Sequence, residues 1–144
     1  MPSYDIPSFL KKQCSERKYQ LWLTRKARAL VKLDRKCGNK HAIQSKYKQE
    51  IHKAVNDCRG RDAYTGKKLD WRLISEYNNK LAKEKRQKYK KLFANLPTVD
   101  HVDGRTTAPN FKICSWQVND CKSDLSLKDF IKLAKVIIAY ADKK

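Results

Sequence analysis

Residues 98–124, TVDHVDGRTTAPNFKICSWQVNDCKSD, decide the fold that we expect, because two strand-like runs and a helix-like run follow one another closely. TVDHVDG ends at Gly104 and is typical of a short strand, and NFKICS predicts a second strand after the loop RTTAP. Ser115 can then cap a short helix over WQVNDCKSD. This order of strand, loop, strand and helix brings the ends of a hairpin and a helix together around one concave spot.

Four polar residues of this segment are the candidates for its chemistry: Asp100, His101, Asn110 and Asn119. Carboxylate and amide oxygens suit Mg²⁺ or Mn²⁺ held with several waters and a substrate phosphate. An imidazole beside such an ion can act as a general base, and a side-chain or backbone carbonyl at Asn110 could fix its tautomer. Adjacent residues on a regular strand point to opposite faces, so Asp100 and His101 serve one metal site only if the backbone twists there.

Basic helical stretches precede this segment. Residues 8–36 predict a helix with Ser8 as its cap and a stop signal at residues 37–39, Cys-Gly-Asn. Residues 40–57 predict a second helix, since Ile43, Tyr47, Ile51 and Val55 fall four apart on one face. Residues 73–95 predict a third, which contains the densest positive run, KEKRQKYKK, and which Pro97 ends.

The composition limits the partners. The chain has 144 residues, with 34 Lys and Arg against 15 Asp and Glu, which gives a formal charge of +19. Such an excess chiefly favours binding to a polyanion or to an anionic membrane surface. Any one lysine-rich helix, however, is as often a solvated face as a binding surface. The N-terminus lacks a secretory pattern, and no run of about 18 apolar residues exists, so we expect a soluble cytoplasmic protein without a membrane partner.

The five cysteines argue against a disulfide framework or a zinc knuckle, because they are odd in number and do not form CxxC pairs. We therefore expect an α+β, mostly helical protein with reduced thiols. Its predicted parts are a basic helical region, 1–57, and a second region, 58–144, which carries the hairpin, a helical insertion at 73–97 and a C-terminal helix that Ser126 opens.

The set D100-H101, N110 and N119-x-x-K122 resembles the motif of HNH endonucleases, in the HNN variant of the ββα-metal nuclease fold. CRGRDAYTGKKL, residues 58–69, is similar to the segment that opens their hairpin. The resemblance covers residues 58 to about 130 and implies a DNA endonuclease that hydrolyses phosphodiester bonds with one Mg²⁺ or Mn²⁺. It implies that His101 is the general base, that Asp100 and Asn119 are metal ligands, and that Asn110 orients His101.

The chain also departs from that family's pattern. Many members bind a structural zinc through paired cysteines, but Arg61 stands where that pattern would have a partner for Cys58, so we do not expect zinc. Helix 73–95 is a long insertion that either contacts DNA or braces the site. The role that the resemblance implies for Lys122 stays open between a phosphate contact and support of its helix.

Double-stranded DNA is the expected partner, and we name Lys122, Arg105, Lys85, Arg86, Lys88 and Lys90 as its contacts. Lysine and arginine that meet phosphates release counterions and gain affinity without reading a base sequence. A homodimer would place two such sites on opposite strands. The nuclease would belong to a restriction, phage or mobile-element setting, in a prokaryote or a phage.

Two other functions remain open at this stage. A non-catalytic nucleic-acid-binding protein could keep a nuclease-like fold, although a pure binder has no physical reason to retain Asp100, His101 and Asn119 together. An anionic-membrane protein would need a strongly amphipathic surface helix, a condition that residues 8–36 meet only weakly.

Overall fold

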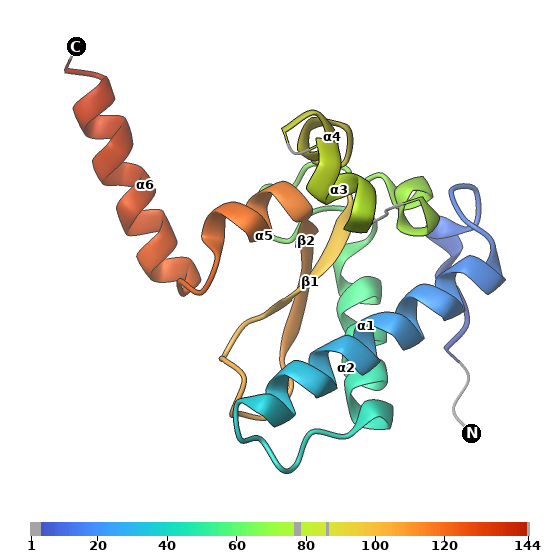
Figure 1. The fold of residues 1–144 in the computed structure, drawn as a ribbon. Coiled ribbons are helices and arrows are strands. Elements are labelled where there is room, and N and C mark those ends of the chain that lie inside the picture. The colour runs from blue at the N-terminus through green and yellow to red at the C-terminus, as the bar shows by residue number, and fades with distance from the viewer. Residues whose placement is uncertain (1–3, 77–78, 86, 144) are drawn as a thin grey trace.

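A two-stranded antiparallel sheet and the helices around it form an α+β, mostly helical fold, as the sequence predicts (Figure 1). The computed structural model describes residues 4–76, 79–85 and 87–143. In chain order the elements are η1 (Ser8–Leu10), α1 (Glu16–Lys36), α2 (Gln44–Cys58), η2 (Trp71–Ser75), α3 (Asn79–Lys85), α4 (Gln87–Leu92), β1 (Pro97–His101), β2 (Phe111–Ser115), α5 (Trp116–Lys122) and α6 (Leu127–Ala141).

The first long helix begins later than predicted. Ser8 opens only the short 3-10 turn η1, and α1 begins after Ser15, whose Oγ accepts the N–H of Lys18 at 3.2 Å. The reason is that the preceding segment turns back onto the start of α1, where the Glu16 carboxylate accepts the N–H of Ile6 at 3.0 Å. The predicted stop signal is confirmed, since α1 ends at Lys36 and Gly38 has a φ of +94°.

The third predicted helix, 73–95, is confirmed over Asn79–Lys85 and Gln87–Leu92, which are α3 and α4. Its predicted start was wrong, because residues 73–75 belong to the 3-10 turn η2, and residues 93–95 form a turn. Residues 77–78 and 86 are outside the described part of the chain. In η2, Trp71 and Ile74 are both buried, and a spacing of three residues puts them on one side of a 3-10 turn. Burial of this pair therefore selects a tighter turn than the α-helix that the composition favours.

The two predicted strands are confirmed. β1 and β2 pair with Pro97 opposite Ser115 and His101 opposite Phe111, and the connecting loop turns at Gly104, whose φ is +91°. Four of the five residues of each strand are buried, because α2 packs on β2 and α5 packs on both strands. The hairpin is therefore held at the centre of the fold.

One hydrophobic core joins the N-terminal helices to the hairpin. Its largest fully buried side chains come from both predicted regions of the chain: Tyr19, Trp22, Leu23, Tyr47, Ile51, Trp71 and Ile113. Trp22 of α1 meets Trp71 of η2 edge to face, with ring centroids 5.4 Å apart. The predicted boundary at residue 57 thus falls inside a shared core.

The last two helices begin at the predicted serine caps. Ser115 Oγ accepts the N–H of Val118, and Ser126 Oγ accepts the N–H of Asp129, each at 3.1 Å. α6 then projects away from the rest of the fold (Figure 1), and none of its residues is buried. Six of its large apolar side chains are between 44 and 64% exposed, namely Ile131, Leu133, Val136, Ile137, Ile138 and Tyr140.

In the described residues, no helix has both the length and the apolar character needed to cross a bilayer. All five cysteines lie in this part of the chain and are free thiols.

Candidate active site

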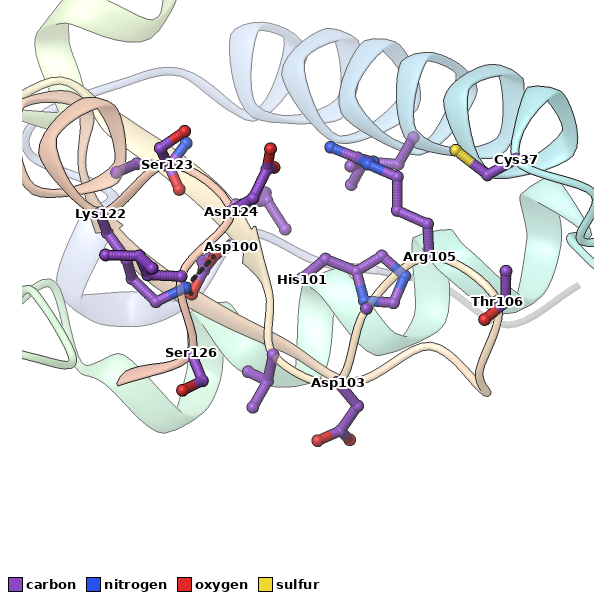
Figure 2. Close-up of a pocket in the computed structure, with 16 residues that line it drawn as sticks. Cys37, Asp100, His101, Asp103, Arg105, Thr106, Lys122, Ser123, Asp124 and Ser126 are labelled. Atoms are coloured by element: carbon purple, nitrogen blue, oxygen red, sulfur yellow. Dashed lines mark hydrogen bonds and ion pairs between the residues drawn. The ribbon is translucent and has the colours of Figure 1, made fainter. Parts of the chain in front are cut away.

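A cavity of about 680 Å³ lies where the end of β1, the β1–β2 loop, the C-terminal end of α5 and the last turns of α1 meet. Asp100, His101, Asn119 and Lys122 all line it, as Figure 2 shows for the three of these that it labels. The hairpin and the helix therefore bring together the two predicted metal ligands and the predicted base.

Asp100 and His101 point in different directions from the end of β1. The Asp100 carboxylate lies beside Lys122 of α5, whereas the His101 ring extends toward Arg105 and the side of α1 (Figure 2). This divergence follows from the alternation of side chains along a strand. Both residues still border one cavity, because it lies around the end of the strand.

Asp100 is 5% exposed and has two donors. The Tyr64 hydroxyl donates to its Oδ2, and the Lys122 ammonium lies 3.2 Å from Oδ2 and 3.4 Å from Oδ1. Burial, followed by this hydrogen bond to Asp100, raises the pKa of Tyr64 above its ordinary value, so the phenol keeps the proton that it donates. Asp100 is therefore held in one orientation from two sides.

His101 is held through one ring nitrogen. Its side chain is 5% exposed, and Nε2 lies 2.8 Å from Oδ2 of Asp34 on α1. Phe111 and Tyr47 pack against the ring edge to face, with centroids 4.9 and 6.4 Å away. Nδ1 is buried and has no hydrogen-bond partner among the described residues.

Asp34 was not among the predicted site residues. Its carboxylate is 0% exposed, and it also accepts from the Tyr47 hydroxyl and from Nη1 of Arg105 at 3.1 Å. Burial, followed by the hydrogen bond to Asp34, raises the pKa of Tyr47 above its ordinary value. One sequence signal could have found Asp34: it continues the apolar stripe of Leu23, Ala27 and Leu30 at helical spacing, where a charged residue needs buried partners.

The predicted contact between Asn110 and His101 is not what the structure has. The backbone oxygen of Asn110 accepts the N–H of Val102 at 2.9 Å, and its side-chain amide donates to Asp103 at 2.8 Å. Asn110 therefore closes the β1–β2 loop, and Asp34 is the acceptor beside His101. The physical reason is the direction of the His101 ring, which points toward α1 (Figure 2), where its Nε2 meets Asp34 at 2.8 Å.

The predicted DNA contacts occupy different environments. Lys122 is 3% exposed and lines the cavity, where it is paired with Asp100, so its ammonium supports the site from inside. Its contact with DNA stays a prediction. Arg105 is paired with Asp34, yet its side chain is 37% exposed at the rim of the cavity.

The basic run of α3 and α4 lies elsewhere. Lys85, Lys88 and Lys90 are exposed, and Lys90 pairs with Asp120 of α5 at 2.9 Å. Arg86 lies outside the described residues. These three lysines do not line the cavity that contains Asp100 and His101, so their contact with DNA stays a prediction.

The oxygen donors in the cavity fit a hard divalent cation. Asp100 and Asn119 can supply two oxygen ligands, and Mg²⁺ is commonly bound by one or two protein ligands together with waters and a phosphate. Within the described residues, no group of three or more His, Cys, Asp or Glu side chains could hold a metal ion. A metal at this site would therefore depend on the Asn119 amide as well as on Asp100.

Comparisons of the chain with protein-family models, with curated proteins and with solved structures found no match.

Proposed function

We propose that this protein is a metal-dependent DNA endonuclease that hydrolyses phosphodiester bonds, as its resemblance to HNH endonucleases implies. One observation carries the proposal: Asp100, His101 and Asn119 border the same cavity. A second supports it, since a buried ring nitrogen of His101 lacks a partner among the described residues. A buried polar atom is normally satisfied, and an unsatisfied one calls for an explanation. A reacting water is a suitable partner for this nitrogen.

In this proposal, His101 takes a proton from the attacking water at Nδ1. A general base has to lie about 2.6–3.2 Å from the proton's oxygen, either directly or through one water. Since Nδ1 is covered, the side chains around it have to shift when substrate enters the cavity. The β1–β2 loop borders the cavity on this side and belongs to the part of the site that would adjust.

Asp100 and Asn119 would hold one Mg²⁺ or Mn²⁺, and Lys122 and Tyr64 would keep the Asp100 carboxylate in place. When bound, the metal would neutralise charge on the scissile phosphate and on the leaving 3′ oxygen. The products would carry 5′-phosphate and 3′-hydroxyl ends.

The excess of positive charge favours a polyanion as the partner, and the resemblance to HNH endonucleases makes double-stranded DNA the one that we propose. A homodimer that cuts both strands, and a cytoplasmic setting, belong to the same proposal.

A second candidate is a nucleic-acid-binding protein without catalysis. The observation that favours it is the ion pair between Asp100 and Lys122, which satisfies the carboxylate without a metal ion. Both candidates bind DNA, so only a measurement of cleavage separates them.

The test is incubation of the full chain with supercoiled plasmid in Mg²⁺ or Mn²⁺, beside the variant His101→Ala. We expect nicked or linear plasmid from the wild type. We expect the variant to cleave about 10²–10⁴-fold more slowly, because general-base catalysis is typically worth that much. In a gel shift, the variant should bind DNA nearly as well as the wild type, because affinity comes mainly from phosphate contacts elsewhere.

His41→Ala is the matched control, because His41 is exposed and lies outside the cavity. Undiminished turnover by His101→Ala would remove His101 from the mechanism. Full cleavage after exhaustive removal of metal would overturn the metal-dependent proposal, and DNA binding without cleavage under any divalent ion would select the second candidate.

A further inference from the structure

The N-terminal helix α1 contributes a buried carboxylate to the candidate active site. Asp34 lies 67 residues before His101 in the sequence, and its Oδ2 meets His101 Nε2 at 2.8 Å. The predicted motif covers only residues 100–122, so the motif gives no indication that a carboxylate of α1 belongs to the site.

We propose that Asp34 is a positioning residue for His101, which holds the proton of the neutral imidazole on Nε2 and leaves the lone pair on Nδ1. This inference rests on the proposed function, because it assigns the reacting nitrogen of that same base.

The chemistry of the two groups supports this assignment. A neutral imidazole has one N–H donor and one acceptor nitrogen, whereas an ionised carboxylate only accepts. A contact of 2.8 Å between Nε2 and Oδ2 therefore requires the N–H on Nε2. Nδ1, which has no partner among the described residues, is then the nitrogen that can receive a proton.

The surroundings of Asp34 keep its carboxylate in place. The Tyr47 hydroxyl and the Arg105 guanidinium also donate to it, and Arg105 supplies the positive charge that a buried carboxylate needs. Asn39 fastens the loop that carries Arg105, since its side-chain amide donates to the backbone oxygen of Arg105 at 3.0 Å. Three donors on one fully buried carboxylate leave it little freedom to rotate away from His101.

A purely structural role for Asp34 would also explain its burial, so the test has to report which nitrogen of the His101 imidazole carries the proton. The protein contains three histidines, and loss of one set of signals in His101→Gln assigns His101 in a long-range ¹H–¹⁵N spectrum. At pH 8, where an ordinary histidine is neutral, the nitrogen shifts distinguish the two tautomers. We expect the wild-type protein to show the tautomer protonated on Nε2.

Asp34→Asn keeps the shape of the side chain but lets the amide donate, so the preference for Nε2–H should weaken or reverse. In single-turnover plasmid cleavage this variant should be about 10²–10⁴-fold slower, as expected when a base is left in the wrong tautomer, while its DNA affinity stays unchanged. Asp57→Asn is the matched control, because Asp57 is an exposed carboxylate near the end of α2.

The outcomes separate this inference from the proposed function. Wild-type His101 protonated on Nδ1 would overturn the inference, even if Asp34→Asn does not fold. A folded Asp34→Asn variant with unchanged tautomer and unchanged rate would also overturn it, while the nuclease proposal would stand. If the wild type cleaves no plasmid, the proposed function fails, whereas the spectrum still decides whether Asp34 sets the tautomer.

Discussion

The carboxylate of Asp62 connects two segments that surround the site. It is 3% exposed, its Oδ1 accepts the N–H groups of Tyr64 and Thr65 at 2.7 and 3.1 Å, and its Oδ2 accepts the N–H of Ser115 at 2.9 Å. The turn that carries Tyr64 is therefore fixed to the end of β2. This is why the Tyr64 hydroxyl reaches Asp100.

We predict that Asp62→Ala lowers the free energy of unfolding by about 3 kcal/mol, because hydrogen bonds to charged groups are strong and their buried donors would be left unpaired. The check is denaturant unfolding, with Asp57→Ala, an exposed carboxylate, as the control. A loss of less than about 1 kcal/mol would mean that water replaces the carboxylate at low cost.

At the residue scale, the sequence predicted contacts that are local and not those that are distant. Ser115 and Ser126 cap helices three residues before their donors, so the pattern is complete within a few positions. In contrast, Asp34 lies 67 residues from its partner His101, and Asp62 lies 53 residues from its partner Ser115. Only the packing of α1 and of the 62–65 turn on the hairpin creates them.

Helix α1 borders several hollows of the surface. Leu30 and Cys37 line the cavity of the candidate active site, and on another side α1 lines a basic groove of about 460 Å³ with Arg28, Lys32 and Lys36. The predicted DNA-binding run of α3 and α4 instead has its Lys90 paired with Asp120. Arg28, Lys32 and Lys36 are exposed on a helix that also borders the cavity, so they are further candidates for phosphate contacts.

We predict that replacing Arg28, Lys32 and Lys36 by Gln weakens binding to all DNA sequences alike. The dependence of affinity on salt should flatten by up to about 0.9 in logarithmic slope per lost contact, because lysine and arginine at phosphates release counterions. Binding titrations at several salt concentrations measure this slope, and turnover at saturating DNA should survive.

The matched variant neutralises Lys85, Arg86, Lys88 and Lys90, which should flatten the slope by the same amount per contact if that run meets DNA. An unchanged slope in either variant would identify its residues as a solvated face.

At the element scale, the hairpin and its two following helices were predictable because turn and cap signals bound each of them. The start of the predicted helix 73–95 was not predictable, since the composition favours an α-helix while burial of Trp71 and Ile74 imposes a 3-10 turn over Trp71–Ser75. Tertiary packing overrides local preference there. Asn110 shows the same limit within the site, because its place in the loop was predictable but the direction of the His101 ring was not.

The whole molecule shares one hydrophobic core between the N-terminal helices and the hairpin. Phe111 of β2 meets Tyr47 of α2 edge to face, with ring centroids 5.4 Å apart, and Asp34 adds a polar link from α1 to His101. The predicted regions 1–57 and 58–144 are therefore interdependent, although their compositions differ.

We predict that the fragment 58–144 does not fold alone, because it would expose the face of β2 that α2 covers. Circular dichroism should show no cooperative thermal transition for this fragment. Deletion of residues 127–144 is the comparison: none of the residues of α6 is buried, so that deletion should leave the transition temperature within a few degrees of the full chain. A cooperative transition in fragment 58–144 would contradict the dependence on α1 and α2.

The exposed apolar side chains of α6 also affect how readily copies of the protein associate at different salt concentrations. At low ionic strength the charge of +19 keeps copies of the chain apart. The Debye length shrinks from about 10 Å at 0.1 M salt to about 3 Å at 1 M, so added salt removes this repulsion while it leaves the attraction between apolar surfaces in place. The same salt that would release the protein from a polyanion therefore drives its copies toward one another through α6. The protein is best dispersed under the conditions in which the proposed binding to DNA would be strongest.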